Sequence, residues 1–387
     1  MTTATWKSWA RPRLQVVLVF ALLYLFLVSI KLMGSGFETL GRGFANLLER
    51  TVANPAVGLA LGVLVTSLVH SSSTVTSIVV GLVAAGQLSV AEAVPVIMGA
   101  NIGTTVTNML VSVVHVSHKP EFRRAVSTAT LHDFFNILTV AILFPVELLT
   151  GYLARTASLV TQLLVGIKTG RMPSPLSVVI DPGVGLLQGW VADLLRAAAW
   201  GREVQGRVLG LALVGVAVLL LFSSLLLLVK SLRSLLAERM EGVLDRYLFT
   251  TTGRALLVGL VLTMLVQSSG VTTSLLVPLG AAGLLTLERA FPYTMGTNIG
   301  TTVTAILASL ATDSPEALTI ALVHTVFNVT GVTLMLTIRP LGRLPIYLAR
   351  KMGDAVMHNR AIVLAYILLV FYLIPGILVF LSHWLSR

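Results

Sequence analysis

Residues 98–107 read MGANIGTTVT, and residues 295–304 read MGTNIGTTVT, which is the same string with a single difference. The similarity extends backwards without a gap: residues 66–107 align with residues 263–304, and 24 of these 42 positions are identical. Composition alone does not produce a run of seven identical residues that contains an asparagine. A looser echo follows each copy, HDFFN at 132–136 and HTVFN at 324–328. The chain is therefore expected to contain two structural repeats.

The composition places both repeats in a membrane. Of the 387 residues, 56% are hydrophobic and 11% are charged, and the mean hydropathy is +0.92. A soluble core cannot cover so much apolar surface, and the length suggests about ten membrane segments of roughly 20 residues each. The sequence has no cysteine, which excludes disulfides and thiolate metal sites. We therefore predict an all-α polytopic membrane protein.

The net charge of +11 is explained by basic loops on one side of a membrane. The basic residues lie in short loops between apolar runs, as on the cytoplasmic side of an inner or plasma membrane. They are not interleaved with exposed aromatic residues, so nucleic-acid binding is not expected. The basic segment 1–13, followed by the apolar run 14–30, predicts a retained first span with a cytoplasmic N-terminus.

The apolar runs and the repeat divide the chain into five parts. The segments between the repeats are the least apolar: an amphipathic helix against the membrane is expected at 186–200, and a charged, helical linker at 230–254. The predicted parts are the N-terminal helix and first connection (1–55), the first repeat (56–150), a connecting segment (151–207), the second repeat (208–340), and a basic cytoplasmic loop with a final span (341–387).

The uncharged stretch 56–85 has 30 residues, too many for one span and too few for two. This length fits a broken helix or a re-entrant hairpin, and the break is expected at the HSSS motif, 70–73. The counterpart in the second repeat is QSSG, 267–270. Irregular backbone at membrane depth is tolerated where it is buried in protein or lines a polar cavity. The two motifs are therefore predicted to meet at a central binding site, with the repeats inverted if their axis lies in the membrane plane.

The residues at this site suit both an alkali cation and an oxyanion. Asparagine carbonyl and threonine hydroxyl oxygens are ligands for the cation, and hydroxyl donors with helix N-termini suit the anion. Only one charged side chain, Glu92, lies within 51–118, and only two lie within 255–312. An anion bound here has no buried Arg or Lys, so a co-bound cation is needed to offset its charge.

Three histidines and one aspartate in the apolar segments each have two interpretations. A carboxylate in an apolar helix, such as Asp133, is a functional hypothesis by default, and the alternative is a structural bond to His132 or Asn136. His70 stands where the second motif has Gln267, and either binds substrate or serves as a pH-sensitive group. His132 and His324 recur in both repeats and serve either helix packing or transport.

The paired motifs resemble those of the type II sodium–phosphate cotransporter family. The resemblance covers roughly 63–149 and 248–352, and includes the NIGTTVT strings, HDFFN, and the segments 287–308 and 343–350. It implies sodium-driven uptake of inorganic phosphate, with sodium as co-substrate and no cofactor. The aspartate of HDFFN, Asp133, is similar to that of electrogenic members.

Residues from the motifs and from this resemblance make up the predicted site. Phosphate is expected at His70, Ser71, Ser72, Ser73, Gln267, Ser268, Ser269, Asn101 and Asn298. Sodium, the only metal expected, is assigned to Asp133, Asn136, Thr104, Thr105, Thr272, Thr273, Thr301 and Thr302.

The chain departs from the family pattern at His70, Gly270, His115 and His118, which puts one sodium site and the pH profile in question. It also lacks the cysteine-bearing outer loop of animal members, so a bacterial inner membrane is expected.

Three other functions are compatible with parts of the sequence. The same site could carry arsenate, sulfate or a small dicarboxylate with sodium. An intramembrane serine protease would use Ser71 or Ser268 with His132 or His324, but the serines recur in both repeats and no Gly-x-Ser-x-Gly elbow is present. A phosphate-sensing scaffold is a further alternative. The oligomeric state is left open, with a homodimer as one alternative.

Overall fold

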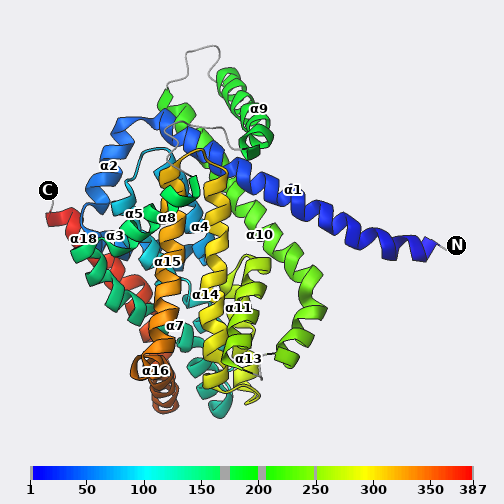
Figure 1. Ribbon diagram of the computed structural model, residues 1–387, viewed down its shortest axis with the longest axis vertical. Coiled ribbons are helices and arrows are strands. Elements are labelled where there is room, and N and C mark those ends of the chain that lie inside the picture. The colour runs from blue at the N-terminus through cyan, green and yellow to red at the C-terminus, as the bar shows by residue number, and fades with distance from the viewer. Residues whose placement is uncertain (1–2, 166–174, 199–205, 248–250, 386–387) are drawn as a thin grey trace.

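The computed structural model describes residues 3–165, 175–198, 206–247 and 251–385, and these form helices without any strand (Figure 1). Seven helices in these ranges are long and apolar enough to cross a membrane, or eight if one bent pair counts as a span. The all-α polytopic prediction is confirmed. The number of candidate spans is below the ten membrane segments expected from the length, because the broken segments form helices of 10–17 residues, each too short to span the membrane alone.

Three long helices lie beside the repeats: α1 (Thr3–Leu40), α9 (Pro175–Ala198) and α10 (Gly206–Tyr247). The first span continues beyond residue 30 to Leu40. The linker expected at 230–254 forms the last part of α10 as far as Tyr247, and its residues 248–250 lie outside the described residues. The helix expected from residue 186 begins at Pro175. The rest of the predicted connection, 166–174 and 199–205, lies outside the described residues. A Cβ on Gly36 would lie 2.8 Å from Val214, so α1 and α10 pack closely.

The repeats contain matching series of helices. The first has α3 (Pro55–Val69), α4 (Ser72–Ala84), α5 (Val90–Gly103), α6 (Val106–Val113) and α7 (Lys119–Thr150), preceded by α2 (Arg42–Val52) and followed by α8 (Tyr152–Val165). The second has α11 (Thr252–Val266), α12 (Ser269–Ser274), α13 (Leu276–Ala281), α14 (Leu287–Leu310) and α15 (Pro315–Thr337). The chain ends with α16 (Arg339–His358), α17 (Ala361–Ile367), the π-helical segment η1 (Leu368–Leu373) and α18 (Ile374–Leu385).

Equivalent glycines set the helix packing in both repeats. A Cβ on Gly99 would lie 2.0 Å from the carbonyl oxygen of Leu59, and one on Gly296 would lie 1.9 Å from that of Leu256. The helix that carries each NIGTT string thus lies backbone to backbone against the first helix of its repeat, α3 or α11. Only glycine permits an approach this close.

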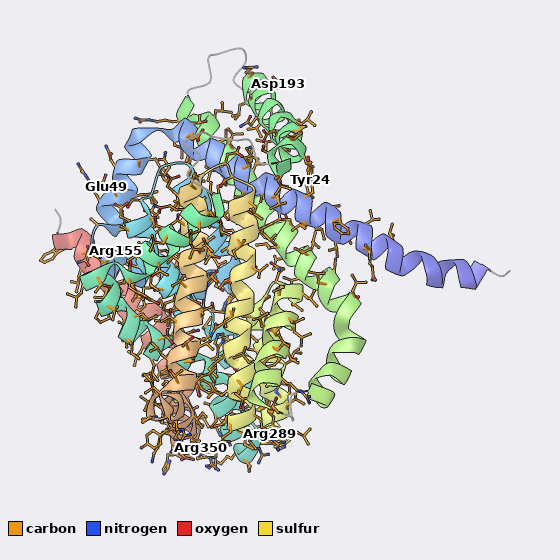
Figure 2. The ribbon with its side chains drawn as sticks, in the orientation of Figure 1. Tyr24, Glu49, Arg155, Asp193, Arg289 and Arg350 are labelled. Carbon is orange, nitrogen blue, oxygen red and sulfur yellow. The ribbon has the colours of Figure 1, made fainter. Side chains whose placement is uncertain are left out.

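The turns that follow α4 and α13 lie at opposite ends of the molecule. The turn after α4, 85–89, helps to line a cavity of about 960 Å³ beside α1 and α9, together with the loop between α14 and α15. The turn after α13 lies near the start of α7, where Arg124 Nε donates to the carbonyl of Ala281 at 2.7 Å. Figure 2 places Arg289, just after this turn, at the end of the molecule opposite Asp193 of α9.

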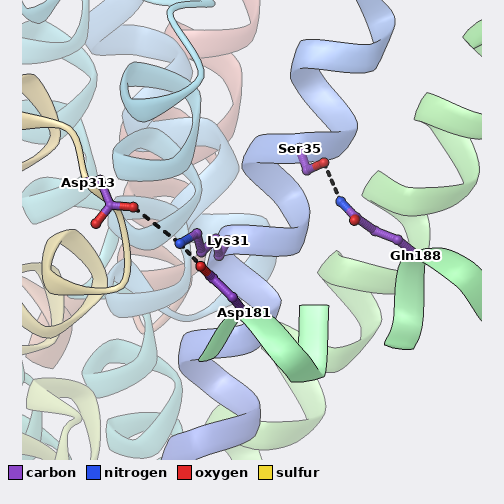
Figure 3. Close-up of polar contacts among 5 residues, drawn as sticks. All are labelled: Lys31, Ser35, Asp181, Gln188 and Asp313. Carbon is purple, nitrogen blue, oxygen red and sulfur yellow. Dashed lines mark hydrogen bonds and ion pairs between the residues drawn. The ribbon is translucent and has the colours of Figure 1, made fainter. Parts of the chain in front are cut away.

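An ion-pair cluster ties the long outer helices to the second repeat (Figure 3). Lys31 Nζ on α1 lies 2.5 Å from Asp181 Oδ1 on α9 and 3.2 Å from Asp313 Oδ2 in the loop between α14 and α15. Nearby, Gln188 Nε2 donates to Ser35 Oγ at 2.5 Å. Lys31 is therefore the cation that two carboxylates from different elements share.

Lys31→Met is expected to lower the free energy of unfolding by about 1–2 kcal/mol, because it removes the cation from both carboxylates. Asp181→Asn should lower the free energy of unfolding by less than Lys31→Met does. The Asp181 side chain is 56% exposed, and Lys31 keeps its pair with Asp313, whose side chain is only 30% exposed. Thermal unfolding midpoints in detergent measure both effects. The difference in unfolding midpoint between Lys31→Met and the wild type should become smaller as the salt concentration is raised. A wild-type midpoint for Lys31→Met at low salt would rule out a stabilising role.

Candidate functional site

Both predicted helix breaks are confirmed, and they have the same geometry. His70 directly follows α3 and has a φ of 57°, and Gln267 directly follows α11 and has a φ of 60°. Ser71 then caps α4 by accepting from the Thr74 amide at 3.2 Å, and Ser268 caps α12 in the same way. A left-handed conformation costs a non-glycine residue about 1–2 kcal/mol, and such strain concentrates at functional sites.

The two breaks contact each other inside the protein. Ser73 Oγ in the first motif donates to the backbone carbonyl of Gln267 in the second at 3.2 Å. Thr304 Oγ1, the last residue of the second string, donates to Gln267 Oε1 at 2.7 Å and accepts from Ser73 at 3.4 Å. The two motifs therefore form one polar centre, to which both repeats contribute.

The histidines and asparagines of the two repeats pair crosswise. His132 Nε2 lies 2.9 Å from Asn298 Oδ1, and His324 Nε2 lies 3.2 Å from Asn101 Oδ1. His132 corresponds to His324 and Asn101 to Asn298, so each repeat's histidine binds the other repeat's asparagine. Such an exchange is what a two-fold relation produces. All four side chains are buried, and the centre is a joint between the repeats.

Asp133 is fully buried, and hydroxyl groups surround its carboxylate. Thr105 Oγ1 donates to Oδ1 at 2.8 Å, and the Tyr366 hydroxyl donates to Oδ2. The alternative structural partners of Asp133, His132 and Asn136, instead take part in bonds with Asn298. In the described part of the chain no Lys or Arg forms an ion pair with Asp133, so its charge lies among neutral donors.

The remaining predicted site residues differ in their surroundings. Thr104, Thr301 and Thr302 donate to carbonyls of their own helices, which leaves their oxygen lone pairs available. Ser72, Ser73 and Ser269 are buried, whereas His70 is exposed. Thr272 pairs with Thr263 at 2.7 Å. These residues lie on the segments that meet at the centre, and their individual roles stay predictions.

Besides Thr304, two further residues of the centre, Asn108 and Tyr366, were absent from the predicted site. Asn108 Nδ2 donates to Thr273 Oγ1 at 2.9 Å and lies 3.3 Å from His132 Nδ1. It directly follows the repeated string, and the second repeat has Ala305 at that position, so repeat comparison gave no signal. Tyr366 comes from the final apolar run, outside both repeats, and no pattern marks it.

The donor set suits monovalent cations better than other metals. In the described residues no group of three or more His, Cys, Asp or Glu side chains could hold a metal ion. The centre offers neutral amide and hydroxyl oxygens and one carboxylate, Asp133. Hard oxygen ligands of low total charge fit sodium.

Two repeats whose broken helices meet at a buried polar centre define the architecture of a secondary transporter. A family model described as Na+/Pi-cotransporter matches residues 25–169 and 219–365. The chain belongs to the Na+/Pi-cotransporter family. This confirms the resemblance, and it sets aside the protease alternative because the family consists of transporters and not of enzymes.

Curated relatives extend over most of the chain. The sodium-dependent phosphate transport protein 2A of Ovis aries is 35% identical over 95% of this chain and 68% of its own length. The 2A protein of Rattus norvegicus is also 35% identical, over 94% of this chain and 67% of its own length. The 2B protein of Homo sapiens is 34% identical over 93% of this chain and 64% of its own length. No solved structure matches.

Proposed function

We propose that this protein is a sodium-driven symporter that imports inorganic phosphate by alternating access and moves net positive charge. The observation that carries the proposal is the joint between the repeats, which is lined by neutral donors and acceptors and holds one carboxylate, Asp133. A multivalent anion entering such a site needs cations with it, because neutral dipoles offset only part of its charge. The names of the relatives agree with this cargo.

An inverted arrangement of the repeats is part of the proposal. The turn after α4 lies near α9, and the turn after α13 lies near α7 and α16, at the opposite end (Figures 1 and 2). If the long axis of the molecule is the membrane normal, the two hairpins enter from opposite sides and their breaks meet near the midplane. Inverted repeats let one architecture adopt inward-facing and outward-facing states.

We assign the α16 end to the cytoplasm. Basic residues concentrate there, on α16 and at the starts of α7 and α14: Lys119, Arg123, Arg124, Arg289, Arg339, Arg343, Arg350 and Lys351. The positive-inside rule then places the 960 Å³ cavity on the outer side. A cytoplasmic N-terminus and a bacterial inner membrane complete this proposal.

Within the centre, phosphate is assigned to the two broken motifs and the crossed asparagines. Sodium is assigned to Asp133 and Asn136, to four threonines of the repeated strings (Thr104, Thr105, Thr301 and Thr302), and to Thr272 and Thr273 on α12. The helix N-terminus at Ser71 and the hydroxyls beside it supply donors for the anion. The carboxylate of Asp133 supplies the negative charge for one cation.

Purified protein in liposomes tests the function. An inward sodium gradient should drive accumulation of labelled phosphate, and an inside-negative potential should speed it. Uptake that proceeds equally well in choline would contradict sodium coupling. Arsenate, sulfate and small dicarboxylates are then tested as competitors of labelled phosphate uptake. A site built mainly from neutral donors discriminates between anions by their shape and charge, so the strength of competition ranks the alternative cargoes.

A further inference from the structure

The helix α16 joins two candidate membrane spans at the end of the molecule opposite α9 (Figure 1). The span before it ends at Thr337, and the span after it begins at Ala361. Five charged side chains on α16 itself prevent it from crossing the membrane. Both ends of α16 therefore lie at the same membrane surface, and the helix runs along that surface.

One face of α16 packs against α7. Pro345, Ala349 and Gly353 follow each other at intervals of four residues, and all three are buried. A Cβ on Gly353 would lie 2.0 Å from Ser127 Oγ and 2.8 Å from the carbonyl oxygen of Arg123, so the two helices touch. This contact determines which face of α16 points away from the protein.

The opposite face is basic and aromatic. Arg343, Tyr347 and Lys351 are also four residues apart, so they form one line along the helix, and all three are exposed. Lys351 Nζ lies 5.6 Å from the centroid of the Tyr347 ring. Leu344, next to Arg343, is exposed as well. Cations alternating with exposed apolar and aromatic side chains are typical of a helix in the headgroup region of a bilayer.

The two cations of this line form no ion pair among the side chains that the structure describes. The neighbouring carboxylates have other partners: Asp354 pairs with Arg123 at 2.7 Å, and Glu288 pairs with Arg350. Asp354 is also the single acidic residue of α16. The two cations of the line are therefore free to meet an anion from outside the chain.

We propose that the line formed by Arg343, Tyr347 and Lys351 binds the headgroup of an anionic phospholipid. The two cations donate to its phosphate oxygens, and the Tyr347 ring and Leu344 contact the upper part of the acyl chains. A zwitterionic headgroup carries a cation of its own, so an anionic headgroup complements this line better. A lipid also explains the exposed apolar side chains, which free phosphate would leave in water. The surface lies outside the central site, so the inference is independent of the transported cargo.

Tyr347→Trp places a fluorophore on the line and permits a direct test. The purified full-length variant is reconstituted into phosphatidylcholine vesicles that contain increasing fractions of either brominated phosphatidylglycerol or brominated phosphatidylcholine. Bromine quenches tryptophan on contact, and the signal of the five native tryptophans is subtracted with wild-type protein. We expect the phosphatidylglycerol to be preferred about fivefold, which is the effect of one basic residue near an anionic surface. Adding Arg343→Gln and Lys351→Gln should abolish the preference.

Arg155→Gln in the Tyr347→Trp background is the matched control. It removes an exposed positive charge on α8, which Figure 2 shows well away from Arg350 of α16, and should keep the preference. Equal quenching by the two brominated lipids would overturn the proposal, as would a preference that survives the loss of both cations. A preference that disappears when inorganic phosphate replaces chloride at constant ionic strength would assign the site to free phosphate and overturn it too. No uptake is measured, so a failure of the proposed transport function would leave this result unchanged.

Discussion

Asp133→Asn is expected to leave phosphate uptake sodium-dependent while abolishing its response to membrane potential. The carboxylate is buried and, among the described residues, accepts from the hydroxyls of Thr105 and Tyr366. Its negative charge is therefore available to hold one sodium ion. Removing that charge is expected to remove the sodium ion that it holds. The phosphate and the sodium ions that still travel with it would then carry no net charge across the membrane. Uptake into proteoliposomes under an imposed potassium diffusion potential measures the change.

The choice of substitution matters at this position. Asp133→Gly would leave the Tyr366 hydroxyl without its carboxylate acceptor, and an orphaned group costs about 1–3 kcal/mol, whereas Thr105 Oγ1 also lies 2.8 Å from the Ile102 carbonyl. Asparagine keeps one acceptor and is the better probe of charge. Tyr366→Phe is the matched control, because it removes a hydrogen bond and keeps the carboxylate, so it should retain the response to potential. Wild-type currents from Asp133→Asn would exclude Asp133 as the carrier of the extra charge.

The breaks at 70–73 and 267–270 could be predicted because their cause is local. An uncharged stretch of 30 residues is incompatible with one straight span, and small polar residues mark where it breaks. The start of α5 also has a local cause, because Ser89 and Glu92 form a capping box. The assignment of the other site residues depended on the repeat and the family resemblance.

The crossed pairs could not be predicted, because their members are far apart in the sequence. The bond between His132 and Asn298 spans 166 residues, that between His324 and Asn101 spans 223, and that between Tyr366 and Asp133 spans 233. No local pattern carries such information. The repeat indicates that two equivalent clusters exist, but not that each histidine crosses to the other one.

The identical NIGTTVT strings adopt different structures for a tertiary reason. In the first repeat Asn136 Nδ2 donates to the Asn101 carbonyl at 2.8 Å, and the Thr105 amide bonds to Ile102 at 3.2 Å instead. Together with the bond from Thr105 to Asp133, this separates α5 from α6. In the second repeat α14 runs unbroken through the string. Sequence identity over seven residues does not determine the backbone when the packed side chains differ.

Ser268→Ala is expected to lower the efficiency of phosphate uptake, kcat/KM, by about 100-fold. The hydroxyl accepts from the Val271 amide at 3.3 Å as the cap of α12, and losing a cap costs about 1 kcal/mol. A hydrogen bond to a charged ligand contributes about 1.5–3 kcal/mol more. Ser71→Ala, the equivalent change in the first repeat, should have a comparable effect. Sodium-driven uptake of labelled phosphate at several concentrations gives both constants.

Three further variants separate capping from binding. Ser268→Thr keeps the hydroxyl and the cap, so it should retain most of the uptake. Ser268→Asp also caps well but brings a negative charge toward the anion, so it should fold and still fail to transport. Met98→Leu changes a fully buried residue of the same region at nearly constant volume and should remain close to wild type. Normal uptake by Ser268→Asp would mean that the anion binds elsewhere, because a site at Ser268 could not accept phosphate beside a fixed carboxylate.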